Sequence, residues 1–102
     1  MIATDLPIPL PLEAITEICR RYQVRELSLF GSAARGEMRE DSDIDLMVEF
    51  LPDARIGFMA FNRMERELAA AVGRKVDLVS RRGLKPRIAP YVLRDAKPIY
   101  AA

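Results

Sequence analysis

The sequence contains no histidine and only one cysteine, Cys19, among its 102 residues. Without histidine the chain cannot form a Ser-His or Cys-His catalytic pair, nor an ordinary zinc site. A single cysteine excludes an internal disulfide, and its position on the apolar side of a predicted helix indicates a buried thiol rather than a reactive one. Any acid-base or metal chemistry must therefore come from carboxylates.

The chain also lacks a long apolar run and a strong net charge. No stretch of about 18 apolar residues is present, so no membrane span is expected. Sixteen basic and fifteen acidic residues give a net charge of +1, which does not favour general binding to nucleic acid through phosphates. Residues 1–11 are broken by prolines and lack the charged start of a secretion signal, which indicates an extended leader on a cytoplasmic protein.

The composition is that of one globular unit, with 50% hydrophobic and 30% charged residues. We expect a single domain over residues 1–102, large enough for one core but too small for a catalytic domain and a separate substrate-binding domain. Helical and strand-like periodicities alternate along it. The predicted elements are helices over 12–22, 33–35, 58–72 and 91–95, and strands over 24–30, 44–50, 75–80 and 99–100.

These elements predict an α/β (α+β) fold with a small mixed β-sheet and flanking helices. Ser32 is expected to cap the short second helix, Gly36 to end it, and Gly73 to end the long third one. The apolar stripe of that third helix, which begins at Phe58, is interpreted as core. Pro98 is expected to precede an edge strand.

Several polar residues that could bind a metal ion or a phosphate lie near two predicted strands. Asp43 and Asp45 are two residues apart and lie on one strand face, where paired carboxylates suit magnesium ions that also bind substrate phosphates. Asp77 is the natural third ligand if its strand is a neighbour. Ten residues before Asp43, Gly31 lets the backbone approach a phosphate, and the hydroxyl of Ser32 at a helix start adds an anion site. Together they suit a triphosphate with metal ions.

Six basic residues crowd the region after the strand that carries Asp77. A solvated face and a contact with phosphate or a partner both remain open as explanations of this cluster. Its members are Arg74, Lys75, Arg81, Arg82, Lys85 and Arg87.

The segments GSAARG at 31–36 and SDIDL at 42–46, with the acidic loop between them, resemble the signature of the minimal nucleotidyltransferases. These are small members of the DNA polymerase beta-like nucleotidyltransferase superfamily, and the resemblance covers residues 12–100. It implies that Gly31 and Ser32 bind nucleotide phosphate, that Asp43 and Asp45 hold two magnesium ions, and that Asp77 helps to activate the acceptor.

Arg35 also matches a family position. Phosphate contact and structural pairing with Glu37, Glu40 or Asp41 are both open for it.

The resemblance further implies a partner, because a domain of this size has no acceptor site of its own. Minimal members are similar to the antitoxins of HEPN/MNT toxin-antitoxin pairs, which transfer AMP from ATP to a tyrosine of the HEPN ribonuclease. The alternatives are an antitoxin that acts by docking alone and a transferase for small molecules such as antibiotics, built by dimerisation or with a partner. A homodimer and a hetero-oligomer with the toxin are both compatible with the sequence.

Overall fold

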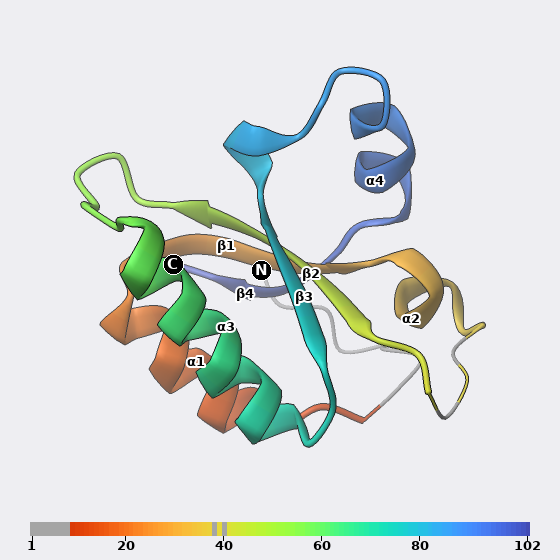
Figure 1. The fold of residues 1–102 in the computed structure, drawn as a ribbon, viewed down its shortest axis with the longest axis horizontal. Coiled ribbons are helices and arrows are strands. Elements are labelled where there is room, and N and C mark those ends of the chain that lie inside the picture. The colour runs from red at the N-terminus through yellow and green to blue at the C-terminus, as the bar shows by residue number, and fades with distance from the viewer. Residues whose placement is uncertain (1–8, 38, 40) are drawn as a thin grey trace.

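Helices and strands follow one another in nearly the predicted order (Figure 1). The computed structural model describes residues 9–37, 39 and 41–102, so most of the predicted leader lies outside the described residues. The elements are α1 (Leu12–Arg21), β1 (Val24–Phe30), α2 (Gly31–Arg35), β2 (Ile44–Phe50), α3 (Phe58–Val72), β3 (Val76–Ser80), the 3-10 turn η1 (Arg81–Gly83), α4 (Ala89–Asp95) and β4 (Lys97–Ala101).

The strands form one mixed sheet in the order β3-β2-β1-β4. Strand β1 pairs antiparallel with both β2 and β4, whereas β2 and β3 are parallel. The parallel pair follows from the connection through α3, since parallel neighbours need a long crossover and a helix supplies it. Pro98 lies within β4, an edge strand, where a missing N–H is tolerated. The predicted fold class is therefore confirmed.

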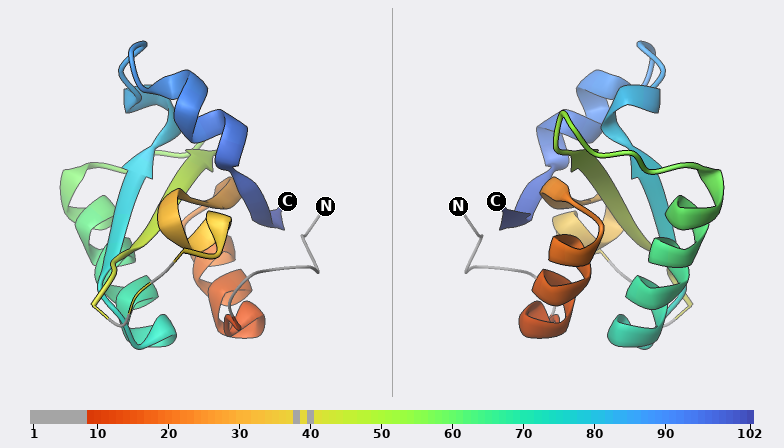
Figure 2. Two further views of the ribbon diagram at one scale, coloured as in Figure 1. Left: turned by 90° about the vertical axis from the view of Figure 1, so that its right-hand side faces the viewer. Right: turned by 90° about the vertical axis from the view of Figure 1, so that its left-hand side faces the viewer.

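The apolar stripes of α1 and α3 meet one face of the sheet. The two helices lie side by side, and α2 and α4 lie away from them, toward the end of β1 (Figures 1 and 2). Leu27, Leu46 and Leu78 from three neighbouring strands are buried with Ile15 and Met64 from the two helices. The α1/α3 face thus carries most of the core, and Asp45 projects from the opposite face, where α2 packs on β1 and β2.

Ion pairing also joins the two core helices. Arg21 on α1 donates a hydrogen bond of 2.6 Å to Glu67 on α3, and the Tyr22 hydroxyl donates to the same carboxylate. Cys19 is buried beside them, and desolvation raises the pKa of its thiol to about 12. The prediction of a buried thiol is confirmed.

Three sequence-based expectations are wrong, and the first is that Pro98 precedes the edge strand, since β4 already begins at Lys97. Helix α2 begins at Gly31 with Phe30 as its N-cap and no side-chain capping bond, so Ser32 lies inside the first turn rather than at the cap. Phe58, assigned to the core, is 82% exposed: it is the first residue of α3 and lies on the wall of a surface pocket. Gly36 and Gly73 do end their helices, both in the left-handed conformation. No described helix is long and apolar enough to cross a membrane.

Candidate active site

Two of the predicted site carboxylates are partners across the parallel strands. Asp45, the second residue of β2, is in register with Asp77, the second residue of β3. Register partners in a parallel pair project from the same face, so both carboxylates leave the sheet on one side. On the other neighbour of β2, Phe30 pairs with Asp45, which brings the start of α2 to the same place. The sheet register alone therefore joins the two sequence motifs.

Gly31 approaches Asp45 more closely than any other residue type could. Its φ is +71°, and a Cβ built at this position would overlap Asp45 Oδ2. Both the left-handed backbone and the lack of a side chain are thus required where β1 turns into α2. The glycine of the motif serves this close contact between backbone and carboxylate.

The electrostatics of Asp45 show that negative charge is concentrated here. Desolvation, followed by the charges of Asp77 and Asp43, raises the pKa of Asp45, and the Arg35 guanidinium opposes this rise. The three predicted carboxylates therefore act on one another in the folded protein. A cation beside them would relieve both the burial cost and the repulsion.

Asp43 lies just before β2 and is half-buried. Its Oδ2 is 3.8 Å from Lys75 Nζ, a long contact between exposed groups that contributes little. The backbone is better fixed, since Ile44 N–H donates to the Lys75 carbonyl at 2.9 Å. The position of Asp43 is thus fixed by this backbone hydrogen bond rather than by the ion pair with Lys75.

Arg35 bridges two helices. Its Nε donates to Glu37 Oε2 at 3.2 Å, and its Nη1 donates to Asp95 Oδ2 on α4 at 3.1 Å. Pairing with Glu37 was one of the anticipated contacts, whereas Glu40 lies outside the described residues. Asp95 was not anticipated, because nothing in a sequence links residues 60 positions apart before the fold is known. Its side chain is only 17% exposed, so it is the better shielded of the two partners.

Glu65 is a second contributor that the sequence did not reveal. This α3 carboxylate accepts a hydrogen bond of 2.8 Å from the backbone N–H of Leu78 on β3. Strand β3 lies at the sheet edge, where an unpaired N–H needs a partner. Glu65 thereby fixes the strand directly beside Asp77.

The donor set fits magnesium. Among the residues that the structure describes, no three acidic, cysteine or histidine side chains are already arranged as a metal site. Magnesium does not require such a cluster, because it is usually held by one or two carboxylates together with waters and substrate phosphates. Asp43, Asp45 and Asp77 supply hard oxygen donors from adjoining positions, and burial together with the charges of Asp77 and Asp43 raises the pKa of Asp45.

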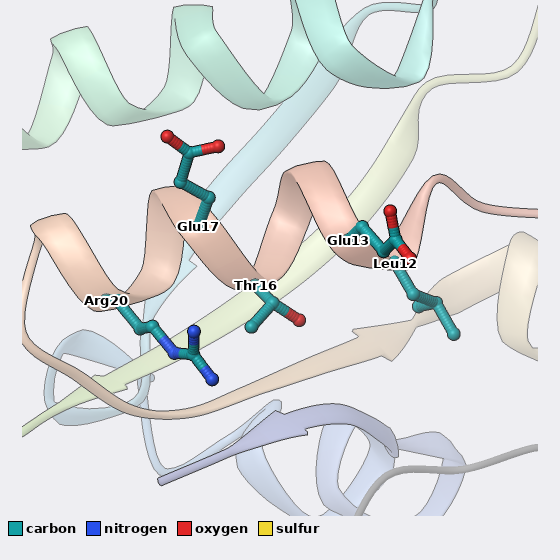
Figure 3. A pocket seen from close by; sticks show the side chains of 5 residues that line it. All are labelled: Leu12, Glu13, Thr16, Glu17 and Arg20. Carbon is teal, nitrogen blue, oxygen red and sulfur yellow. The ribbon is translucent and has the colours of Figure 1, made fainter.

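A shallow pocket on α1 has no connection with these groups (Figure 3). Its volume is about 510 Å3, and its lining comes from Leu12, Glu13, Thr16, Glu17 and Arg20. The side chains spread along one helix instead of converging on a point (Figure 3). This pocket offers no arrangement for chemistry.

The site combines the Asp45–Asp77 register with the contact between Gly31 and Asp45. This arrangement is compatible with a nucleotidyltransferase, and comparison with known proteins identifies the chain as one. The family model described as nucleotidyltransferase domain matches residues 12–98, so the chain belongs to this family. The chain is also similar to protein adenylyltransferase MntA of Thermococcus cleftensis. The two are 43% identical over 79 residues, which cover 78% of each chain. The resemblance to the minimal nucleotidyltransferases is confirmed.

Solved structures agree with this assignment. One assigned to the minimal nucleotidyltransferases has a TM-score of 0.73 and 42% identity, over 86% of this chain and 88% of the other. Another, a toxin-antitoxin with AMP-PNP, has a TM-score of 0.75 and 26% identity, over 91% and 75%. That second protein is therefore a toxin-antitoxin with a nucleotide analogue.

Proposed function

We propose that this nucleotidyltransferase transfers AMP from ATP to a tyrosine hydroxyl of a HEPN-type toxin and thereby acts as its antitoxin. The observation that carries the proposal is the register of Asp45 with Asp77 beside Gly31. It places carboxylates and an open backbone approach at one point of the sheet. The related adenylyltransferase and the toxin-antitoxin complex with AMP-PNP supply the substrate and the class of partner.

Each site residue has a role in this proposal. Gly31 and Ser32 bind the triphosphate, with Ser32 contributing its hydroxyl from the first turn of α2. Arg35 contacts a phosphate with the N–H groups that Glu37 and Asp95 do not use. Asp43 and Asp45 hold two magnesium ions, with Asp77 beside them. Bound there, these ions neutralise the triphosphate and stabilise both the entering and the leaving oxygen.

The chain's own groups then move the proton and align the reactants. Asp77 accepts the proton of the acceptor hydroxyl, whose oxygen forms a bond to the α-phosphorus. The bond from that phosphorus to the oxygen bridging to the β-phosphorus breaks, and pyrophosphate leaves with the electron pair. No step needs histidine, which the sequence lacks.

The test uses the purified chain, magnesium, ATP labelled on its α-phosphate and a purified HEPN-fold toxin that binds the chain. Label should appear on a toxin tyrosine, and Asp45→Asn should reduce transfer at least ~100-fold, because the site loses a charged ligand. Glu13→Gln, which changes an exposed carboxylate on α1 outside the site, is the matched control and should transfer normally.

Absence of label on the toxin with the wild-type chain would refute the proposal. Full neutralisation of the toxin by the double variant Asp43→Ala, Asp45→Ala would instead show that docking alone suffices.

A further inference from the structure

A second pocket lies at the opposite end of β2 from Asp45. Its volume is about 510 Å3, and it forms where β2 leads into the loop before α3. Figure 1 shows this loop at the far end of the sheet from α2. We call it the Phe58 pocket; its apolar wall is formed by Phe50, Leu51, Ile56, Phe58 and Phe61.

One part of the apolar wall is packed against the core, and the other part is exposed to solvent. Phe50 and Phe61 pack edge to face, with ring centroids 6.3 Å apart, so the floor of the pocket is ordered by core contacts. Phe58 and the adjacent Met59 are 82% and 76% exposed. Two large apolar side chains beside a hollow are a common mark of a protein-binding surface, whereas isolated exposed apolar residues are not.

The rim of the Phe58 pocket is positive. Arg25 and Arg82 line it, and neither has an ion-pair partner among the described residues. The lining carboxylate, Glu49, is already engaged by Arg81 at 3.5 Å. The N-terminus of α3 also opens here, with Gly57 as N-cap, no side-chain cap and no acidic residue in its first turn. Its dipole adds positive potential to that of the two arginines.

We propose that the Phe58 pocket is a docking surface for an acidic segment of a partner protein, which inserts an apolar side chain between flanking carboxylates. The identity of that partner as the HEPN-type toxin rests on the proposed function. A second copy of this chain is the poorer occupant, because a two-fold contact would bring the same positive rims together. For Arg82, one of the six basic residues around the strand of Asp77, this proposal favours a contact with a partner over a solvated face.

Docking here leaves the active site accessible. Five residues of strand separate Asp45 from Phe50, about 17 Å at about 3.3 Å per residue. A partner held at the Phe58 pocket can therefore present a tyrosine elsewhere on its surface to Asp45 and Asp77. Binding of the partner and binding of nucleotide become separable by mutation.

The first experiment measures binding of short synthetic peptides to the isotope-labelled chain by NMR. A peptide of glutamate, aspartate, leucine and phenylalanine should shift the amide signals of Leu51, Phe58 and Arg82, and its lysine-containing counterpart should not. Phe58→Ser and Arg82→Glu should each weaken binding at least ~10-fold. The matched controls on other surfaces, Tyr91→Ser and Arg20→Glu, should bind like the wild type.

The second experiment measures the affinity of the same variants for the toxin and for Mg-ATP. Phe58→Ser and Arg82→Glu should lose toxin affinity and keep Mg-ATP affinity. If no AMP is transferred but these variants still lose toxin binding, the proposed function fails and the docking surface stands. Peptide shifts centred on another face, unchanged toxin affinity, or a wild-type homodimer dissociated by Phe58→Ser would each overturn the proposal.

Discussion

The Cα of Gly31 lies against the carboxylate of Asp45, so closely that no larger residue fits without moving Asp45. The contact ties the turn at the end of β1 to the second residue of β2. The glycine of one motif and the aspartate of the other are therefore in direct contact in the folded protein.

Gly31→Ala should therefore damage both stability and activity. The left-handed backbone costs a non-glycine residue about 1 kcal/mol, and displacement of Asp45 adds to this. Transfer of AMP should fall at least ~100-fold. The matched control is Gly73→Ala, because Gly73 has a similar φ of +77° but open space around a built Cβ. Urea unfolding should show only the backbone cost at position 73, and equal losses at both positions would contradict the overlap.

Asp45→Asn should stabilise the metal-free protein at neutral pH. Because burial and the neighbouring carboxylates raise the pKa of Asp45, its contribution to stability is fully present below the unfolded pKa of about 3.9. That contribution is lost as the pH rises through the raised pKa. Thermal unfolding without magnesium should therefore show Asp45→Asn above the wild type at pH 7, with the difference shrinking in acid.

With magnesium and ATP present, the wild type should instead be more stable than Asp45→Asn at pH 7, since only the wild type retains the charged ligand. Asp53→Asn serves as the control for charge removal at an exposed position. A wild type more stable than Asp45→Asn at pH 7 without metal would show that Asp45 is not under electrostatic stress.

Asp95→Asn should raise the KM for ATP about 3-fold to 10-fold, with a smaller change in kcat, because Arg35 would lose its link to α4. Glu37→Gln is the matched control, since Glu37 also pairs with Arg35 but is 64% exposed. Its effect should be smaller. A double-mutant cycle between Arg35→Ala and Asp95→Ala should give a coupling of about 0.5–1 kcal/mol, and additive effects would argue against the bridge.

Glu65→Ala should destabilise the fold by about 1–2 kcal/mol, because the Leu78 N–H would lose its acceptor at the sheet edge. Glu65→Gln retains a carbonyl acceptor in the same place and should cost less than about 0.5 kcal/mol. Amide hydrogen exchange at Leu78 checks this directly. Faster exchange in the alanine variant alone is expected, and equal exchange in both would remove Glu65 as the anchor of β3.

The elements of this fold were largely predictable because the core lies on one face. Alternation in 44–50 and helical spacing in 12–22 are the direct signature of one buried side, and β2 and α1 appear there. Spacing gives the angle of a residue around a helix but not how far the opposing sheet extends. Phe58 was therefore assigned to the core, although no described element covers it at the start of α3.

The site was predictable as far as its chemistry is local. Gly31, Asp43 and Asp45 fall within one short segment, and Asp77 required only that β2 and β3 be neighbours. The N-cap was misplaced by two positions, at Ser32 instead of Phe30, because the left-handed Gly31 already belongs to the helical turn. The contacts of Asp95 and Glu65 with distant elements depend on side-chain geometry that no periodicity encodes.

The parallel pairing of β2 with β3 also sets when activity can arise during synthesis. The ribosome completes Gly31 and Asp45 first, and about thirty further residues, including all of α3, must follow before Asp77 exists. A nascent chain that has just finished β2 holds the phosphate turn without the third carboxylate. With the role proposed for Asp77, nucleotidyl transfer can begin only after β3 has been made, and a product truncated before Asp77 should be catalytically silent.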